Sequence, residues 1–598
     1  MEKINKTSIL GFKYEQKGFD ERLAKTIHQR SELPEVVCNL LSARDVALEE
    51  VDNFIDPKIK NSLPDPFLLS DMQKGVDFVI GAIKNKKKIT IFADYDVDGA
   101  TSAAILKRFL RDIGVEADIY IPDRILEGYG PNKKAMLKLK EQGVDLVITL
   151  DCGTVAFEPL EAAREVGLDV IVIDHHLGVV AKPDAIAVIN PNNLGEKFEH
   201  KNLCAAGVTF LFVVATNKVL RESGFYKDKK EPNLISLLDL VALGTVCDVM
   251  SLTGLNRAFV SAGLKVLKQR KNLGLRSICD KAGLDEEPNA YHFGFVIGPR
   301  INAGGRVGTS NLGAEILSSE DEARIDEIAS QLEGFNQERK DIEAAVLEDA
   351  KAKLEIGEDG YNTDSSVIFA VGKNWHPGVI GIVASRLKDL YEKPVAVVTI
   401  DEENNKAKAS CRSISGIDFG AEILNARAEE IVMEGGGHAM AGGFSIGIDR
   451  IKDLYAFFNK KLSAQVELAR KERKKTFDIS LNLSQVNLDL LREINKLEPF
   501  GVGNYKPKFV LRNVKKLNAK IIGKTREHVS ATFSSKSIIG FDGTMSVVAF
   551  KVAENEIGKM LLDGSYKKEM DLVGTLNINS WMGREKVQMI VEDIIIPS

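Results

Sequence analysis

Four short apolar runs between residues 89 and 173 constrain the fold more than any other feature of the sequence. They span residues 89–93, 117–121, 145–150 and 169–173, and short apolar runs of this kind are typical of strands buried on both faces of a parallel sheet. Segments with helical periodicity, such as 132–142 and 158–166, lie between them. Strands that alternate with helices predict a doubly wound α/β sheet whose ligands bind beyond the carboxyl ends of the strands.

Acidic residues and histidines follow three of these runs. The first run is followed by Asp94, Asp96 and Asp98, the third by Asp151, and the fourth by Asp174, His175 and His176. A further aspartate, Asp248, ends the apolar stretch LLDLVALGTVCDV. Each residue by itself could be a helix cap or a hydrogen-bonding partner within the core. At one rim of one sheet they predict a metal site, because carboxylates this close repel one another unless a cation neutralises them.

The mixture of side chains indicates the kind of metal. Carboxylate oxygens with a few imidazoles favour Mn²⁺ or Mg²⁺ over a metal that prefers thiolates. Two such ions can bind a phosphodiester, activate a water as the nucleophile and stabilise the leaving oxygen. A site of this composition could therefore serve phosphodiester hydrolysis with two divalent cations.

These acidic segments resemble a known superfamily. The segments DYDVDGATS, LDCGT, DHH and GTVCDV are similar to the four motifs of the DHH phosphoesterases. Further segments resemble one branch of that superfamily, the bacterial single-strand-specific exonucleases with DHH, DHHA1 and OB domains. These are GPRINAGGRVG (298–308), WHPGVIGIVASR (375–386), SCRS (410–413), GGGHAMAGGF (435–444) and LEPFGVGN (497–504). The resemblance extends from about residue 70 to the end of the sequence.

The resemblance assigns roles to the acidic residues and histidines. It implies that the metal ligands are Asp96, Asp98, Asp151, His175 and Asp248. Asp94 and His176 lie in the same motifs, where each either ligates a metal directly or holds a ligand or a water by hydrogen bonding. Asp94 is included in the expected metal set, and His176 joins Asp96, Asp98, Asp151, His175 and Asp248 in the expected catalytic set.

The same resemblance, together with local patterns, predicts the domain organisation. It implies two α/β lobes, a doubly wound parallel-sheet DHH domain and a smaller DHHA1 domain, joined by a long helix and followed by an OB-type β-barrel. Residues 318–356 contain no proline and one glycine, and their apolar residues recur at helical spacing. The expected boundaries are 1–70 (mostly helical), 71–315 (DHH), 316–360 (connecting helix), 361–450 (DHHA1), 451–475 (charged linker helix) and 476–598 (OB).

Two segments of the second lobe are candidates for holding a phosphate. Ser410 and Arg412 lie two apart, so on a strand their side chains point the same way and form a hydroxyl and guanidinium clamp. The run Gly436, Gly437 and His438 offers backbone N–H groups to a phosphate, although a glycine run is also typical of a plain loop. The resemblance implies that this lobe captures a 5′-terminal phosphate, which would set the direction of degradation.

A third segment is expected between the two lobes. Arg300, Asn302 and Arg306 in GPRINAGGR are expected to line the path of the strand. The alternative is that this loop only supports the structure around it.

Charge is distributed unevenly along the chain. The formal net charge is −6, but residues 476–598 carry 17 Lys+Arg against 14 Asp+Glu, which leaves −9 for residues 1–475. Residues 506–526 contain eight basic residues and no acidic one. Lys515, Lys516 and Lys520 are therefore expected to contact single-stranded DNA, unless they only protect an edge strand from aggregation. Because the expected metal ligands all precede residue 316, removal of 476–598 is expected to spare the metal site.

Composition excludes several classes of protein. Apolar residues make up 44% and charged residues 28% of the chain, which excludes wholesale disorder. No apolar run is long enough to span a membrane, and the polar start does not resemble a secretory signal. Six scattered cysteines without C-x-x-C spacing favour the reducing cytoplasm.

We therefore expect a 5′→3′ exonuclease that degrades single-stranded DNA to mononucleotides with Mn²⁺ or Mg²⁺, in DNA repair and recombination. One alternative is a DHH phosphoesterase acting on oligoribonucleotides, cyclic dinucleotides or pyrophosphate; another is a non-catalytic single-strand-binding scaffold. The resemblance implies a single-strand-binding protein and a RecQ-like helicase as partners. Nothing in the sequence requires more than a monomer.

Overall fold

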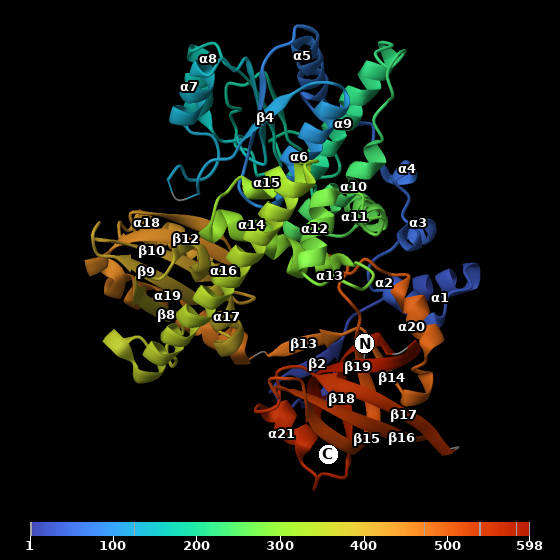
Figure 1. Cartoon of the computed structure of the whole chain (residues 1–598). Coiled ribbons are helices and arrows are strands. Elements are labelled where there is room, and N and C mark those ends of the chain that lie inside the picture. The colour runs from blue at the N-terminus through green and yellow to red at the C-terminus, as the bar shows by residue number, and fades with distance from the viewer. Residues whose placement is uncertain (1–2, 125, 472, 538–539, 582, 597–598) are drawn as a thin grey trace.

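The computed structural model describes residues 3–124, 126–471, 473–537, 540–581 and 583–596. The chain forms three bodies: a first α/β lobe, a second, smaller α/β lobe, and a β-barrel near the C-terminus (Figure 1). The predicted architecture of two α/β lobes, a connecting helix and an OB-type barrel is confirmed. Within the described residues, no helix is long and apolar enough to cross a membrane.

The first lobe is built on a five-stranded parallel sheet in the order β4-β3-β5-β6-β7. Its strands are β3 (Ile89–Ala93), β4 (Ala117–Tyr120), β5 (Leu146–Leu150), β6 (Asp169–Ile173) and β7 (Ala187–Ile189). The four predicted strands are therefore present, with β7 in addition. The direction of winding reverses between β3 and β5, so the carboxyl ends of these two neighbours form the edge where doubly wound sheets bind ligands.

Both faces of this sheet are covered by helices, which explains why its strands are apolar throughout. One face packs on α5 (Met72–Lys84), α6 (Val97–Asp112) and α9 (Ala205–Glu222). The other face packs on α7 (Lys133–Glu141) and α8 (Phe157–Glu165). Side chains that alternate along a strand, such as Ile91 and Phe92, are thus both fully buried.

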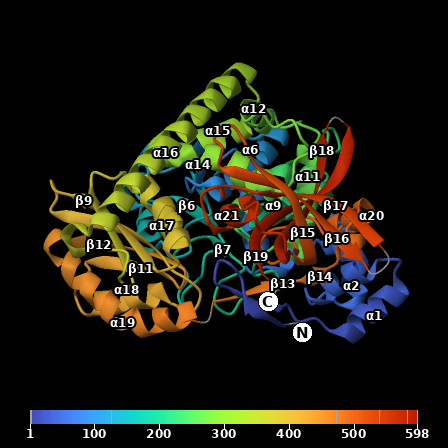
Figure 2. The same cartoon turned by 90° about the horizontal axis from the view of Figure 1, so that it is seen from below.

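A helical layer completes the first lobe and leads to the second. It comprises α10 (Leu238–Cys247), α11 (Gly254–Leu267), α12 (Leu273–Lys281), α13 (Ala290–His292), the π-helix η4 (Phe293–Ile297), α14 (Gly298–Val307) and α15 (Leu312–Ser318). The predicted connecting helix is α16 (Glu322–Ile356), about 50 Å long at the usual helical rise. Its first turns bury Ile325 and Leu332 in the first lobe, and its last turns bury Val346 and Leu354 in the second. Figure 2 shows α16 running between the two lobes.

The second lobe contains a mixed sheet in the order β11-β12-β10-β9-β8. Its elements are β8 (Ile368–Lys373), α17 (Pro377–Tyr391), β9 (Val395–Asp401), β10 (Lys406–Arg412), α18 (Phe419–Ala428), β11 (Glu434–His438), β12 (Ala441–Gly447) and α19 (Ile451–Lys471). Helix α19 covers most of the expected linker 451–475, yet it buries Leu454, Phe458 and Leu462 in the core of this lobe. Because this apolar face packs on the sheet, α19 is part of the lobe.

The C-terminal body is a closed five-stranded barrel, which fits an OB fold. Strands β15 (Lys508–Ile522), β16 (His528–Ser537), β17 (Gly540–Ala549), β19 (Arg584–Ile595) and β18 (Glu569–Trp581) pair in that order. A further pairing between β15 and β18 closes the ring. The short strand β14 (Ile479–Leu481) pairs with β15, helix α20 (Leu488–Asn495) precedes β15, and helix α21 (Glu556–Leu562) lies between β17 and β18.

The N-terminal segment packs on the barrel. Strands β1 (Lys3–Thr7) and β2 (Lys13–Gln16) form a small sheet with β13 (Lys474–Phe477), in which β2 and β13 run parallel. Helices α1 (Glu21–Arg30) and α2 (Glu35–Ser42) share a core with α20 and the barrel strands, and Figure 2 shows them beside α20. The expected helical segment 1–70 therefore begins with two strands and extends the C-terminal body.

Candidate active site

Three aspartates come from the loop after β3 and the start of α6. Asp94 is buried directly after the strand. Asp96 caps α6, and its carboxylate accepts hydrogen bonds from the N–H groups of Asp98 (2.8 Å) and Gly99 (3.1 Å). Gly99 has no room for a side chain, because a Cβ there would lie 2.3 Å from the Asp94 carbonyl oxygen. The motif is thus folded so that its three carboxylates stay close together.

Asp98 is held by a second helix. Its two carboxylate oxygens accept hydrogen bonds from the backbone N–H groups of Ala205 (2.6 Å) and Ala206 (2.9 Å). These groups lie at the N-terminus of α9, where the helix dipole stabilises an anion. Asp98 is therefore fixed in orientation by a segment more than 100 residues away.

The DHH segment after β6 is anchored by its own aspartate. Asp174 is buried and accepts hydrogen bonds from the N–H groups of Thr154 (3.0 Å), His175 (2.7 Å) and His176 (3.2 Å). The side chain of Asn192 donates to the carbonyl oxygen of His175 (2.6 Å). These bonds direct the His175 ring toward the aspartates. Asp174 lies in the predicted cluster but was assigned neither to the metal ligands nor to the catalytic residues; in the structure it anchors the DHH segment.

His175 lies between carboxylates from three chain segments. Its Nε2 atom is 3.2 Å from an oxygen of Asp151, 3.5 Å from Asp248 and 3.8 Å from Asp98. Asp151 follows β5 in the left-handed region, with φ of 61°, and Asp248 is the C-cap of α10. Asp248 thus reaches the site from a helix end, whereas the other acids come from strand ends.

The arrangement brings all the predicted metal ligands together. Ligand atoms lie within 4.8 Å of one another in three sets: Asp94, Asp96 and Asp151; Asp98, His175 and Asp248; and Asp151, His175 and His176. Among the described residues, Asp94, Asp151 and Asp248 each have one buried carboxylate oxygen without a hydrogen-bond partner. Buried oxygens of this kind are costly unless a cation binds them, so the residues fit divalent cations.

The pKa values reflect the crowding of these carboxylates. Burial and the neighbouring charge of Asp96 raise the pKa of Asp94 to about 7. Burial and the charges of Asp98 and Asp96 raise the pKa of Asp248 to about 8 and that of Asp151 well above its usual value. A divalent cation would reverse this by favouring the ionised carboxylates.

His176 has a different environment from His175. Its Nδ1 atom is 2.8 Å from Asp174, and the Tyr129 hydroxyl lies 3.2 Å from the same nitrogen. Burial opposes protonation of the ring, but the hydrogen bond with Asp174 and its charge raise the pKa of His176 to about 9. Asp174 therefore fixes the orientation of the His176 ring, which also belongs to one of the three candidate ligand sets. Tyr129 carries no sequence signal and was not predicted.

A basic pocket of about 450 Å³ lies between the two lobes. Arg124 and Arg306 line it from the first lobe, and Lys408, Ser410 and Arg412 line it from β10 of the second. Ser410 and Arg412 are adjacent as predicted, with Nη1 of Arg412 3.2 Å from Oγ of Ser410. Arg306 Nη1 also donates to the carbonyl oxygen of Gly378 (2.9 Å), which joins the lobes. Arg124 was missed, because a single arginine after a strand has no motif around it.

Other predicted phosphate-binding residues lie outside this pocket. Arg300 is paired with Glu333 and donates to the carbonyl oxygen of Val296 (2.7 Å), and Asn302 is half-buried on α14. Gly436, Gly437 and His438 form part of the edge strand β11. A Cβ at Gly437 would lie 2.4 Å from the Ala441 carbonyl oxygen, so strand packing requires this glycine, whereas Gly436 faces open space.

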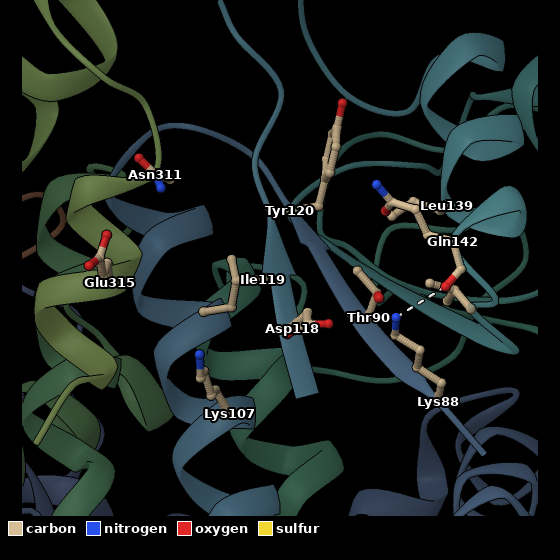
Figure 3. Close-up of a pocket in the computed structure, with 11 residues that line it drawn as sticks. Lys88, Thr90, Lys107, Asp118, Ile119, Tyr120, Leu139, Gln142, Asn311 and Glu315 are labelled. Atoms are coloured by element: carbon tan, nitrogen blue, oxygen red, sulfur yellow. Dashed lines mark hydrogen bonds between the residues drawn. The ribbon is translucent and has the colours of Figure 1, made fainter. Parts of the chain in front are cut away.

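A separate pocket of about 380 Å³ lies beside the edge strand β4, toward the amino ends of the strands. Figure 3 shows it lined by Lys107, Asp118 and Glu315, with Lys88 Nζ donating to the carbonyl oxygen of Gln142 (3.1 Å). Because the metal-site acids lie at the carboxyl ends of the strands, this pocket is distinct from the candidate active site.

Comparison with known proteins identifies the family. Sequence models match the DHH family N-terminal domain at residues 88–245, the DHHA1 domain at 364–464 and the RecJ OB domain at 477–593. The single-stranded-DNA-specific exonuclease RecJ of Haemophilus influenzae is 32% identical over 545 residues, which cover 90% of this chain and 93% of that protein. The chain belongs to the RecJ family.

Other members of the RecJ family are also similar to this chain over most of its length. The Bacillus subtilis single-stranded-DNA-specific exonuclease RecJ is 31% identical over 578 residues, covering 96% of this chain and 70% of the relative. The crystal structure of RecJ in complex with Mn²⁺ from Thermus thermophilus is similar to this fold with a TM-score of 0.75 and 26% identity, covering 97% of this chain and 78% of that one.

The RecJ-type barrel separates the three predicted DNA-contacting lysines. Lys515 and Lys520 are exposed on β15. Lys516 is buried, and its ammonium donates to the carbonyl oxygens of Met560 (3.1 Å) and Asp563 (2.6 Å) at the end of α21. Lys516 therefore holds α21 to the barrel instead of facing single-stranded DNA.

Proposed function

We propose that this RecJ-family protein hydrolyses single-stranded DNA from its 5′ end and releases mononucleotides, using Mn²⁺ or Mg²⁺. The observation that carries the proposal is the pairing of two sites: the acidic cluster around His175 and the basic pocket between the lobes. The named activity of the B. subtilis and H. influenzae relatives and the Mn²⁺ in the T. thermophilus relative support the same substrate and cofactor.

Two divalent cations would be held by Asp94, Asp96, Asp98, Asp151, His175 and Asp248. When bound, they would supply an activated water and stabilise the leaving oxygen of the scissile phosphate. The chain itself orients the ligands: the N-terminus of α9 fixes the Asp98 carboxylate, and the Asp174 loop fixes the His175 ring. Asp174 raises the pKa of His176, and the His176 ring is placed to hold or transfer a proton beside this cluster.

The basic pocket accounts for the direction of degradation. Arg412, Ser410, Arg306 and Arg124 offer guanidinium and hydroxyl donors suited to a terminal phosphate. A strand anchored there by its 5′-phosphate would present a linkage near that end to the acidic cluster. The expected selectivity is therefore for strands with a free 5′ end.

We propose that the barrel binds the part of the single-stranded DNA that extends beyond the catalytic lobes. Lys515 and Lys520 supply exposed charge on β15, as single-strand-binding OB folds require. A single-strand-binding protein and a RecQ-like helicase are proposed partners on the basis of the family resemblance. The six cysteines are unpaired, which supports the proposed cytoplasmic location.

The decisive experiment follows degradation of two single strands with Mn²⁺, one labelled at its 5′ end and the other at its 3′ end. The proposal predicts immediate release of the 5′ label as a mononucleotide and a shortening ladder for the 3′ label. The small-substrate alternative predicts faster cleavage of a dinucleotide than of a long strand. The scaffold alternative predicts binding without cleavage, with the same strand affinity for Asp98→Asn and the wild-type chain.

A further inference from the structure

The segment LEPFGVGN (497–504) forms a rigid elbow between α20 and β15 of the barrel. The side chain of Asn504 donates to the carbonyl oxygens of Leu497 (2.8 Å) and Pro499 (2.9 Å). The backbone N–H of Gly501 donates to the carbonyl oxygen of Asn504 (2.9 Å). These bonds close the segment into a compact turn. None of its residues belongs to the candidate metal site or lines the phosphate pocket.

The elbow docks on the loop that follows Asp248. The backbone N–H of Leu252 donates to the carbonyl oxygen of Val502 (2.7 Å). The glycines on either side allow the close approach, because a Cβ at Gly501 would lie 2.6 Å from Leu252 Cδ1 and one at Gly503 would lie 2.0 Å from Ser251 Oγ. Gly503 also has a φ of 74°, which favours glycine. The barrel is thus in direct contact with the chain four residues beyond a predicted metal ligand.

The first turn of α11 strengthens this contact. Arg257 is almost fully buried, and its guanidinium donates to the carbonyl oxygens of Glu498 (2.7 Å) and Phe54 (2.7 Å). The guanidinium also lies 3.9 Å from the centre of the Phe54 ring. One buried arginine therefore joins the first lobe, the elbow and the N-terminal segment.

The neighbouring residue connects the elbow contact to Asp98. The buried side chain of Asn256 donates to the carbonyl oxygens of Ser251 (3.1 Å) and Asn202 (2.6 Å). Asn202 lies three residues before Ala205, whose N–H holds the Asp98 carboxylate. The loop gripped by the elbow is thus hydrogen-bonded to the segment that orients a second predicted ligand.

The turn between Asp248 and the elbow contact is strained. Val249 has a φ of 60°, which is unfavourable for a β-branched residue. The turn is closed by the N–H of Met250, which donates to the carbonyl oxygen of Thr245 (3.1 Å). This bond and that from the N–H of Val249 to the carbonyl oxygen of Val246 (3.2 Å) end α10 in the left-handed conformation. The elbow contacts the chain two residues after Val249, at Ser251 and Leu252.

We propose that the elbow is a positioning element for the metal site, which places Asp248 and Asp98 through Leu252, Asn256 and Arg257. This inference rests on the proposed metal ligands. It changes one expectation from the sequence: removal of residues 476–598 weakens metal binding as well as strand binding, because the barrel supplies the hold on residues 251–252.

The test measures Mn²⁺ affinity of the full-length protein without DNA, by electron paramagnetic resonance titration. Gly503→Ala is expected to weaken Mn²⁺ binding roughly tenfold, as loss of groups that orient metal ligands does. Gly583→Ala is the matched control, because Gly583 lies in the same barrel, its φ of 73° is close to the 74° of Gly503, and a Cβ there meets no atom within 4 Å. Arg257→Lys, which keeps the charge but not the paired donors, should weaken Mn²⁺ binding in the same direction.

A rescue distinguishes positioning from general damage to the fold. Adding Val249→Gly to Gly503→Ala should recover most of the Mn²⁺ affinity, because glycine adopts the left-handed conformation without support. Hydrogen exchange of residues 244–256 should rise in Gly503→Ala and stay unchanged in Gly583→Ala. If Gly503→Ala and Arg257→Lys both bind Mn²⁺ as the wild-type chain does, the positioning role is wrong. Exonuclease activity of the wild-type chain supports the proposed function independently of that result.

Discussion

Nε2 of His175 lies 3.2 Å from Oδ1 of Asp151, although the two residues follow different strands. The pair exists because β5 and β6 are parallel neighbours, so both chain segments leave the sheet at the same edge. The two residues also share one of the three candidate ligand sets. They therefore connect the acids after β3 and β5 with Asp248 at the end of α10.

Replacement of His175 tests this central position. His175→Ala should reduce kcat with Mn²⁺ by about ten- to hundredfold, since removal of groups that hold a metal or its ligands costs that much. The affinity of the barrel for single-stranded DNA should change little. The measurement is single-strand degradation alongside Mn²⁺ titration, with His28→Ala on the exposed side of α1 as the control. Unchanged Mn²⁺ affinity in His175→Ala would contradict ligation.

The phosphate pocket predicts a dependence on the 5′ end. Arg412→Lys keeps the charge but loses the forked donors that bind a phosphate in two places. We expect the preference for a 5′-phosphorylated over a 5′-hydroxyl strand to fall about tenfold, which corresponds to roughly 1.4 kcal/mol. Rates on both strands measure it, and Arg427→Lys on the exposed face of α18 serves as the control. If Arg412→Lys keeps the full preference for a 5′-phosphorylated strand, the 5′-phosphate binds elsewhere.

The barrel lysines predict two different outcomes. Replacing both Lys515 and Lys520 with glutamine should lower the slope of log affinity against log salt by about 1.4, since each phosphate contact to a single strand contributes about 0.7. Lys516→Met should leave that slope unchanged but reduce the free energy of unfolding by about 1–3 kcal/mol, because two carbonyl oxygens at the end of α21 lose their charged donor. Salt titrations and denaturant unfolding separate the two effects, and a slope change in Lys516→Met would refute its assignment.

The burial of Asp239 predicts that the stability of the protein depends on pH. Burial in α10 raises the pKa of Asp239 to about 7 from an ordinary value of 3.8, so the folded state binds this proton more tightly than the unfolded state. Its contribution to stability is therefore fully present below pH 3.8 and is lost as the pH rises through about 7. Asp239→Asn should raise the free energy of unfolding more at pH 8 than at pH 5, and the two gains should differ by up to about 3 kcal/mol at about 1.4 kcal/mol per pKa unit. Equal gains at both pH values would show that the carboxyl is already ionised in the folded protein.

Much of the first lobe could be predicted from local patterns. The apolar runs marked β3, β4, β5 and β6 because strands buried on both faces need apolar residues at every position. The acids after three of those strands then had to lie at one edge, and the structure places them there. Sequence patterns were weaker where one residue acts alone: Arg124, Tyr129 and Asn256 stand in no motif, and their roles come from contacts with residues far along the chain.

The sequence by itself determined the strands of the first sheet and the long helix, which follow from periodicity, a property of short segments. The barrel and the expected metal ligands came from the resemblance of short motifs to those of the DHH exonucleases. Only the tertiary structure decided that β2 pairs with β13, that Lys516 is buried under α21, and that the elbow at 497–504 grips the loop after Asp248. Such contacts join residues that are mostly far apart in the chain, and they depend on how preformed surfaces pack rather than on any local preference.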